Sequence, residues 1–319
     1  MSLAKIKGHS QIVRRFQEVI QENRLGGVYL FSGPEGIGKS LLAKELAKAL
    51  NCQEEGRDGC DLCPSCLKIE KMQHPDVHFI NSGDSEIKIE FIRQLQRDIN
   101  LRAYEGRKKV FIINDAHKLN ENSSNAILKT LEESGAGNLI ILVTAKPELL
   151  FKTVISRCQG IKFSAFHKID LEQILKQEYG LDQLKAHFLA CFCEGKLGQA
   201  LALKDSDIIK DKNQTIDAFC LKTKENLPEE AGQKRNDIRW QMHILITWFR
   251  DIYLAKVGVP LQELMHFDRK ESLENSINNF SFPEIDQALQ GISSSLLQLE
   301  QNINTRLLLV NLKLSIRRL

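Results

Sequence analysis

The sequence carries a phosphate-binding motif near its start. Residues 33–40 read Gly-Pro-Glu-Gly-Ile-Gly-Lys-Ser, which fits the pattern G-x4-G-K-[ST]. Glycines let backbone N–H groups surround a phosphate, and a helix that begins after the motif adds a favourable dipole. We expect Lys39 to reach the outer phosphates and Ser40 to bind Mg²⁺. The motif predicts binding of ATP or ADP with Mg²⁺ but not hydrolysis. Its expected nucleotide contacts are Gly33, Gly36, Gly38, Lys39 and Ser40.

Four cysteines follow the motif closely. Cys52, Cys60, Cys63 and Cys66 have the spacing C-x7-C-x2-C-x2-C. Two adjacent C-x2-C pairs are typical of a tetrahedral zinc site. No open coordination position beside a general base is apparent, so the expected zinc is structural. The segment is neutral to acidic, which favours a structural or protein-contact role over nucleic-acid binding. Buried or reactive cysteines without a metal are the alternative.

A polar pair ends an apolar run later in the chain. Asn114 and Asp115 follow the sequence Val-Phe-Ile-Ile. In P-loop ATPases an acidic pair stands here, the first acid holding the magnesium shell and the second activating water. Asparagine lacks the negative charge that Mg²⁺ favours, and aspartate is one methylene shorter than glutamate. Asp115 is therefore interpreted as a degenerate catalytic base, and an ordinary strand end with a turn is the alternative.

Alternating strands and helices must position these residues. Up to about residue 164, short apolar runs alternate with helical segments, which predicts an α/β fold with a parallel sheet covered on both faces. The glycine-rich motif lies between a predicted strand and a predicted helix, as such a motif requires. Strands are expected at 27–32, 77–80, 109–113, 139–144 and 160–163, and helices at 40–50, 89–101 and 123–133.

The remainder of the chain predicts helices only. These are expected at 169–177, at 181–192, from 195 onward, and from about 207 to the end, with loops near 226–228, 258–260 and 282–283. The last helix is apolar on almost all sides between residues 307 and 316. We therefore expect it to be largely buried, partly between chains.

Length and composition bound the class of protein. A chain of 319 residues accommodates two or three domains. Hydrophobic residues make up 42% and charged residues 27%, the balance of a soluble globular protein. The apolar runs are far shorter than the roughly 20 residues of a membrane helix, and the first residues do not resemble a signal peptide, so we expect a cytoplasmic protein. The net charge of +3 argues against holding nucleic acid by charge alone.

The order of the motifs resembles the clamp-loader branch of the AAA+ ATPases, the family of the bacterial DNA polymerase III clamp-loader subunits. The match covers about residues 8–164 and comprises Arg24-Leu25, the motif at 33–40, the cysteine insert, the sequence Asn-Ala-Ile-Leu-Lys-Thr-Leu-Glu-Glu at 125–133, Thr144, and Ser156-Arg157-Cys158.

The resemblance implies a three-part architecture. It comprises an AAA+ domain over 1–164 with a parallel five-stranded sheet and a zinc insert at 52–66, a small helical lid over 165–207, and an all-α collar over 208–319 that mediates oligomerisation. The resemblance also implies that Thr144 contacts the nucleotide.

Two departures from the family pattern concern ATP hydrolysis. The motor subunits of the family have Asp followed by Glu at the two positions where this chain has Asn114 and Asp115. They also carry an arginine within a Gly-x-Leu-Arg pattern where this chain has Gly198. A missing positive charge beside the γ-phosphate removes transition-state stabilisation. The resemblance therefore implies a non-motor, stator-like subunit with absent or weak ATPase activity. It would offer Arg157 as an arginine finger in trans to ATP on a neighbouring motor subunit.

The resemblance also implies the partners. They are the motor and delta-type clamp-loader subunits and, through the complex, the sliding clamp and primed DNA, without a membrane. A motor ATPase of the same complex, with Asp115 as base, is the alternative that the unbroken motif at 33–40 supports. An unrelated P-loop enzyme such as a nucleotide kinase is disfavoured by the long helical part and the cysteine insert.

Overall fold

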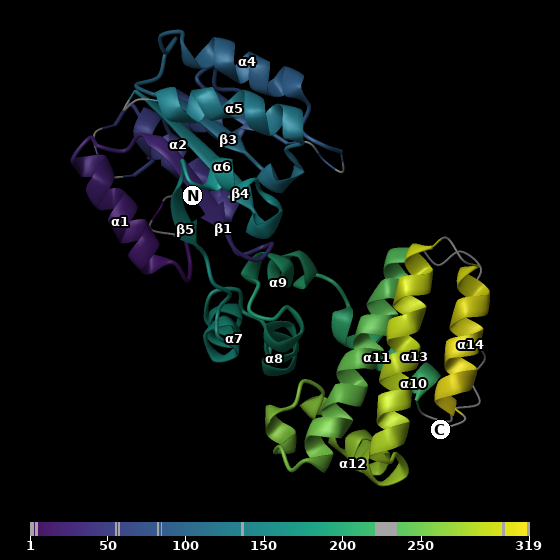
Figure 1. Ribbon diagram of the computed structural model, residues 1–319. Coiled ribbons are helices and arrows are strands. Elements are labelled where there is room, and N and C mark those ends of the chain that lie inside the picture. Colours follow the sequence, from purple (N-terminus) through teal and green to yellow (C-terminus); the bar gives the residue numbers. More distant parts are fainter. Residues whose placement is uncertain are drawn as a thin grey trace. The chain divides into compact units, whose positions relative to one another are not determined.

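A computed structural model describes the chain except residues 1, 2, 4, 5, 55, 57, 82, 84, 135, 136, 221–234, 302, 303, 318 and 319. The chain forms two compact units. One comprises Met1–His167 with Gly195–Gln199, and the other Lys168–Glu194 with Ala200–Leu319. The first unit contains the sheet and the second is built from helices (Figure 1). The division into domains over 1–164, 165–207 and 208–319 stays a prediction.

A parallel five-stranded sheet forms the centre of the first unit, with the strand order β2-β3-β4-β1-β5. All four neighbouring pairs of strands are parallel. The predicted fold class, a parallel five-stranded sheet followed by helical parts, is confirmed. The strands are β1 (Gly27–Ser32), β2 (Val77–Ile80), β3 (Lys109–Ile113), β4 (Asn138–Thr144) and β5 (Gln159–Lys162).

Two hydrophobic layers cover the faces of this sheet. Side chains alternate between the faces along each strand, so Phe31 packs in one layer and Leu30 in the other. Helices α1 and α2 lie on one side of the sheet, and α4 and α5 lie on the opposite side (Figure 1). The helices of this unit are α1 (Ser10–Gln21), α2 (Lys39–Asn51), α3 (Pro64–Glu70), α4 (Ile89–Ile99), α5 (Glu121–Glu133) and α6 (Lys152–Ile155).

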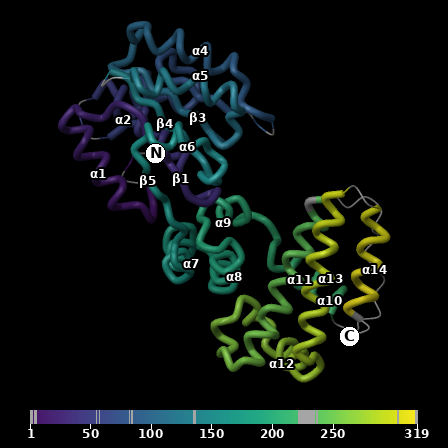
Figure 2. The backbone as a smooth tube through the Cα atoms, in the orientation of Figure 1, coloured from purple at the N-terminus to yellow at the C-terminus, as the bar shows by residue number. Residues whose placement is uncertain are grey.

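The connection from β1 to α2 is the phosphate-binding motif. The chain passes from β1, which lies between β4 and β5, through the motif into α2 (Figure 2). Gly33 has a φ of 139°, and a Cβ at this position would lie 2.3 Å from the carbonyl oxygen of Phe163. Only glycine therefore allows the chain to turn this close to the end of β5.

The second unit consists of packed helices. Helix α7 packs against α8, and the longest helix, α11, packs against α10, α12 and α13. Helix α13 in turn packs against α14. The bounds are α7 (Lys168–Gln177), α8 (Gln183–Phe192), α9 (Leu197–Leu203), α10 (Ile208–Phe219), α11 (Arg235–Lys256), α12 (Lys270–Asn279), α13 (Phe282–Glu300) and α14 (Thr305–Arg317). The first residues of α9 belong to the first unit.

Two predictions for this unit need correction. Phe282 and Pro283 do not form a loop but begin α13, because proline is tolerated in the first turn of a helix. Within this chain helix α14 is only partly buried: Leu308 and Leu312 are buried, whereas Leu307 and Leu314 are 60% and 48% exposed, and its burial between chains stays a prediction. The loop expected near 226–228 lies outside the described residues. Among the described helices, none is long and apolar enough to cross a membrane.

Candidate functional site

Most of the predicted nucleotide-binding residues lie at one edge of the sheet. In a parallel sheet all carboxyl ends meet at the same edge, where ligands of α/β proteins bind. The phosphate-binding motif follows β1, Asn114 follows β3, and Thr144 ends β4. Thr144 pairs in register with Ser32, the residue directly before the motif. The structure thus brings together the motif, Asn114 and Thr144, which the sequence separates by about a hundred positions.

Lys39 is folded onto its own loop. Its Nζ donates hydrogen bonds to the carbonyl oxygens of Gly33, at 2.7 Å, and Pro34, at 2.5 Å. Burial lowers the pKa of the Lys39 ammonium, and the charges of Glu35 and Asp115 partly oppose this change. A nucleotide phosphate entering the loop would replace the two carbonyls as partners of this ammonium.

The hydroxyl expected to bind Mg²⁺ faces a neutral amide. Ser40 Oγ donates a hydrogen bond to Asn114 Oδ1 at 2.7 Å. Asn114 Nδ2 in turn donates to Asn81 Oδ1, after the end of β2, at 2.6 Å. Three uncharged side chains thus form a connected row at the end of the strands. Such a row offers Mg²⁺ oxygen ligands without negative charge, which makes it a poor magnesium site.

Asp115, the predicted degenerate base, has an unusual backbone. Its φ of 49° lies in the left-handed region, which a non-glycine residue adopts at an energetic cost. Its carboxylate lies 3.2 Å from Lys118 Nζ. The carboxylate of Asp115 is thus engaged in an ion pair within its own turn. A role for Asp115 in activating water stays a prediction.

Thr144 is buried and engaged within the chain. Its Oγ1 accepts a hydrogen bond from the backbone N–H of Lys146 at 3.0 Å and lies 3.1 Å from Nδ1 of His117. The side chain of Thr144 is buried at the end of β4. His117, which lies closer to the surface, therefore stands beside the predicted nucleotide contact.

Gly198 brings a second segment onto the phosphate-binding loop. Its backbone N–H donates a hydrogen bond to the carbonyl oxygen of Gly36 at 2.7 Å. A Cβ at position 198 would lie only 2.6 Å from that same oxygen, closer than real Cβ contacts allow. The arginine that the motor pattern places at this position therefore does not fit the observed contact.

Arg157 makes its hydrogen bonds with a different set of residues. Its guanidinium bonds to Glu132 of α5, to the carbonyl of Thr153 in α6 and to the hydroxyl of Ser156. The side chain is 34% exposed. Among the described hydrogen bonds of Arg157, none reaches the phosphate-binding motif.

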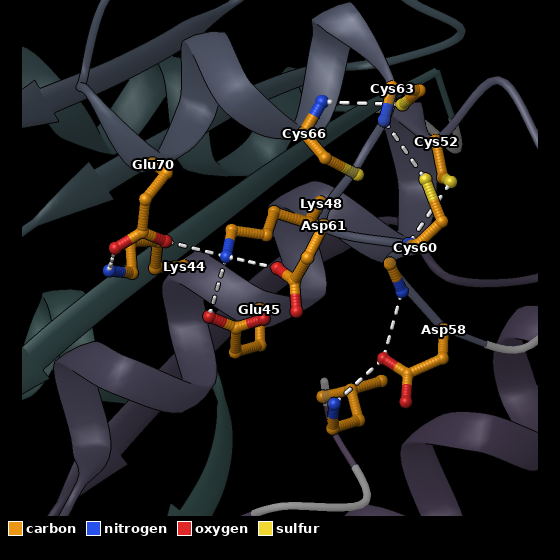
Figure 3. Close-up of polar contacts among 12 residues, drawn as sticks. Lys44, Glu45, Lys48, Cys52, Asp58, Cys60, Asp61, Cys63, Cys66 and Glu70 are labelled. Atoms are coloured by element: carbon orange, nitrogen blue, oxygen red, sulfur yellow. Dashed lines mark hydrogen bonds and ion pairs between the residues drawn. The ribbon is translucent and has the colours of Figure 1, made fainter. Parts of the chain in front are cut away.

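The four predicted metal ligands converge (Figure 3). The sulfur atoms of Cys52, Cys60, Cys63 and Cys66 all lie within 4.8 Å of one another. Zinc–sulfur bonds of about 2.3 Å place the sulfurs of a tetrahedral site about 3.8 Å apart, so the donor set fits one zinc ion. Cys52 and Cys66 are buried.

Backbone donors in this insert favour thiolates. The N–H groups of Cys60 and Cys63 point at the sulfurs of Cys52 and Cys60, at 3.4 and 3.2 Å. Burial opposes ionisation of Cys63, yet hydrogen bonds from the backbone of Gln53 and Cys66 lower its pKa to about 6. Burial raises the pKa of the Cys66 thiol. A bound zinc would supply the charge that keeps such a buried thiol deprotonated.

A buried ammonium joins the insert to the phosphate-binding helix (Figure 3). Lys48 of α2 is fully buried. Its Nζ contacts Glu45 Oε1 at 3.0 Å, Asp61 Oδ1 at 2.8 Å and Glu70 Oε2 at 2.6 Å. Asp61 lies between the cysteines and Glu70 ends α3, so one ammonium holds three elements together. Hydrogen bonds from Lys44 and Lys48 lower the pKa of Glu70 to about 2.

Sequence reasoning missed four residues of these sites. Asn81 and His117 could have been suspected, because each lies at or after the carboxyl end of a predicted strand. Lys48 is one of several lysines of α2, and its position in the sequence gives no such indication. Glu132 lies 25 positions before Arg157, a separation that predicts no contact.

Comparison with known proteins places the chain in a family. The family described as "DNA polymerase III, delta subunit" matches residues 8–167, and "DNA polymerase III, delta subunit, C terminal" matches residues 208–317. The chain is 25% identical to DNA polymerase III subunit delta' of Bacillus subtilis, over 96% of this chain and 95% of that protein.

Two further similarities cover different shares of the chain. DNA polymerase III subunit tau of Escherichia coli is 34% identical over 67% of this chain, which spans 34% of the length of tau. A solved structure of a gamma-subunit-related protein from Thermotoga maritima has a TM-score of 0.46 and 17% identity, covering 96% of this chain and 98% of that one.

The buried ion cluster leads to a stability prediction. We expect Lys48→Met to lower the free energy of unfolding by about 3–5 kcal/mol, because it leaves the buried carboxylate of Glu45 without its charge partner. Urea denaturation followed by circular dichroism measures this change. Lys44→Met, one turn earlier in α2, is the matched control and should cost clearly less, since Lys44 pairs with the half-exposed Glu70 rather than with a buried carboxylate.

A double variant separates buried charge from lost packing. Glu45→Leu together with Lys48→Met replaces the pair by apolar side chains and should recover part of the lost stability. Equal losses for Lys48→Met and Lys44→Met would show that the cluster does not hold the insert.

Proposed function

The chain belongs to the DNA polymerase III delta-subunit family and is a clamp-loader subunit of the delta-prime type; from this premise we propose that it is a non-motor, stator-like subunit. In this role it helps to load the sliding clamp onto primed DNA without hydrolysing ATP itself. Its direct partners would be the motor and delta-type subunits, and a replication subunit of this kind would work in the cytoplasm.

The observation that carries the proposal is the hydrogen bond from Ser40 to Asn114. The hydroxyl that would bind Mg²⁺ is 2.7 Å from an uncharged amide oxygen, at the place where a motor subunit would need a carboxylate. Without that charge the metal is held weakly, and phosphoryl transfer loses the ion that neutralises its transition state.

The contact at Gly198 supports the same proposal. A positive side chain beside the γ-phosphate stabilises the transition state of hydrolysis, and a Cβ at this position would lie 2.6 Å from the carbonyl oxygen of Gly36 unless that contact shifted. The backbone contact with Gly36 instead holds Gly198 against the phosphate-binding loop. A phosphate-binding loop held by contacts within the chain is expected in a subunit whose conformation does not change with nucleotide binding.

The surroundings of Arg157 support its action in trans. Leu149 and Phe151, which precede α6 in the chain, are 57% and 43% exposed, and we propose that a neighbouring motor subunit covers them. An adjacent motor subunit covering them would bring its bound ATP toward the guanidinium. An arginine finger stabilises the negative charge that develops on the transferred phosphoryl group.

We further propose that the four-cysteine insert binds one structural zinc ion. The sulfur positions support this assignment. An insert ordered by zinc would in turn be attached to α2 by the ion pairs of Asp61 and Glu70 with Lys48. Four thiolates would fill the coordination shell of the zinc ion, which leaves no open position for a catalytic water or a substrate.

Nucleotide turnover separates the proposed role from a motor subunit. We expect the isolated chain to hydrolyse ATP at a negligible rate, with or without primed DNA, because Asn114 cannot replace a metal-binding carboxylate. A phosphate-release assay on the purified chain, with Lys39→Ala as control, measures this. Robust DNA-stimulated hydrolysis that disappears in Lys39→Ala would instead identify a motor ATPase with Asp115 as its base.

Removal of Arg157 should act only in the assembled complex. We expect Arg157→Ala to leave the chain folded but to lower ATP turnover of the reconstituted clamp loader several-fold. An arginine finger contributes a factor of about 10³–10⁵ at the site it serves, while the other sites keep their own. Arg93→Ala, which removes an exposed arginine of α4, is the matched control. Normal turnover with Arg157→Ala would refute the trans role.

Zinc binding is tested by metal content and stability together. We expect about one zinc per chain, and we expect Cys63→Ser to lower both the zinc content and the melting temperature, because metal binding contributes directly to folding. Cys191→Ser, outside the cluster, should change neither quantity. A fully folded chain purified without zinc would contradict the assignment.

A further inference from the structure

The guanidinium of Arg157 is held from two sides. On one side, Nε and Nη2 both donate to the same carboxylate oxygen of Glu132, Oε1, which lies 2.7 Å from Nε. On the other side, Nη1 donates to the carbonyl oxygen of Thr153 at 3.0 Å. The plane of the guanidinium is thereby fixed by α5 and α6 together.

We propose that Glu132 is the positioning residue of the arginine finger. It holds Nε and Nη2 of Arg157 so that the guanidinium is already oriented when a motor subunit with bound ATP docks. The inference rests on the proposed trans role of Arg157 and extends it to a second residue on a different helix.

Helix electrostatics indicate that Glu132 does not serve its own helix. Glu132 and Glu133 are the last two residues of α5 (Glu121–Glu133). A helix C-terminus carries partial negative charge, so acidic residues there are unfavourable. Glu133 has a loose ion pair with Lys129 at 3.9 Å, whereas the charge of Glu132 is balanced by Arg157. The pair thus explains a carboxylate that the helix alone disfavours.

The two sides of the guanidinium differ in how easily they exchange partners. The bonds to Glu132 join opposite charges, which makes them the stronger ones. The bond from Nη1 goes to a neutral carbonyl, and a phosphate oxygen of a neighbouring ATP is a better acceptor than a carbonyl. On docking, Nη1 can therefore exchange Thr153 for phosphate while Glu132 keeps its hold. Arginine has enough N–H donors for both tasks.

The position of the pair makes it testable. Glu132 and Arg157 are 52% and 34% exposed, and exposed ion pairs contribute little to folding. Removal of the carboxylate should therefore leave the chain folded and change only the orientation of the finger. A long arginine side chain without this partner samples many rotamers.

The test uses the clamp loader reconstituted with its motor subunits. We expect Glu132→Ala to lower kcat for ATP several-fold and to leave KM for ATP unchanged, because the finger acts in the transition state rather than in ATP binding. Glu132→Gln should recover part of the loss, since its amide oxygen still accepts a hydrogen bond. Glu133→Ala removes the adjacent acid of the same helix and should have no effect. Unchanged melting temperatures exclude a folding defect.

A double-mutant cycle separates failure of this inference from failure of the trans role. We expect Glu132→Ala to have no further effect in the Arg157→Ala background, because it acts through that arginine. Normal turnover with Arg157→Ala alone would overturn the finger itself. If Arg157→Ala lowers turnover but Glu132→Ala does not, the finger stands and the positioning role is refuted. Higher turnover with Glu132→Ala would also refute it, because Glu132 would then restrain the finger.

Discussion

The parallel alignment of five strands is the constraint on which the site depends. Because all strands run the same way, everything that follows a strand arrives at one edge. The order β2-β3-β4-β1-β5 places β1 inside the sheet, so the phosphate-binding loop is flanked by the ends of β4 and β5. The same arrangement aligns Asn81, Asn114 and Ser40 in one row of hydrogen bonds. Hydrophobic layers on both faces hold the strands in this register.

A buried charge extends this order to the cysteine insert. Lys48 lies two turns and more beyond the phosphate-binding motif on α2, and its three carboxylate partners come from α2, the insert and the end of α3. Glu45 Oε2 has no hydrogen-bond partner among the described residues, so the cluster depends on the ammonium for its balance. Removing one partner of a buried pair costs much more than exchanging the whole pair for apolar groups. The insert is therefore fixed by electrostatics as well as by its sulfur cluster.

The sequence alone predicts the features that depend on local residue patterns. Apolar runs predicted all five strands to within one residue, since a strand buried on both faces must be continuously apolar. Cysteine spacing predicted the cluster, and the glycine motif predicted the loop. Contacts between distant segments could not be read in this way, as Glu132 with Arg157 and Gly198 with Gly36 show. Helix α14 was predicted to be largely buried, but composition cannot tell which leucines face away from the chain's own core, as Leu307 does.

The intact phosphate-binding motif is compatible with a subunit that does not hydrolyse ATP. The two side chains that would serve a nucleotide already have partners within the chain: Lys39 bonds to loop carbonyls and Ser40 to Asn114. These hydrogen bonds hold both side chains in place through groups of the chain itself. The glycines of the motif then serve the turn between β1 and α2, whereas Arg157 is held independently of that loop by contacts with α5 and α6.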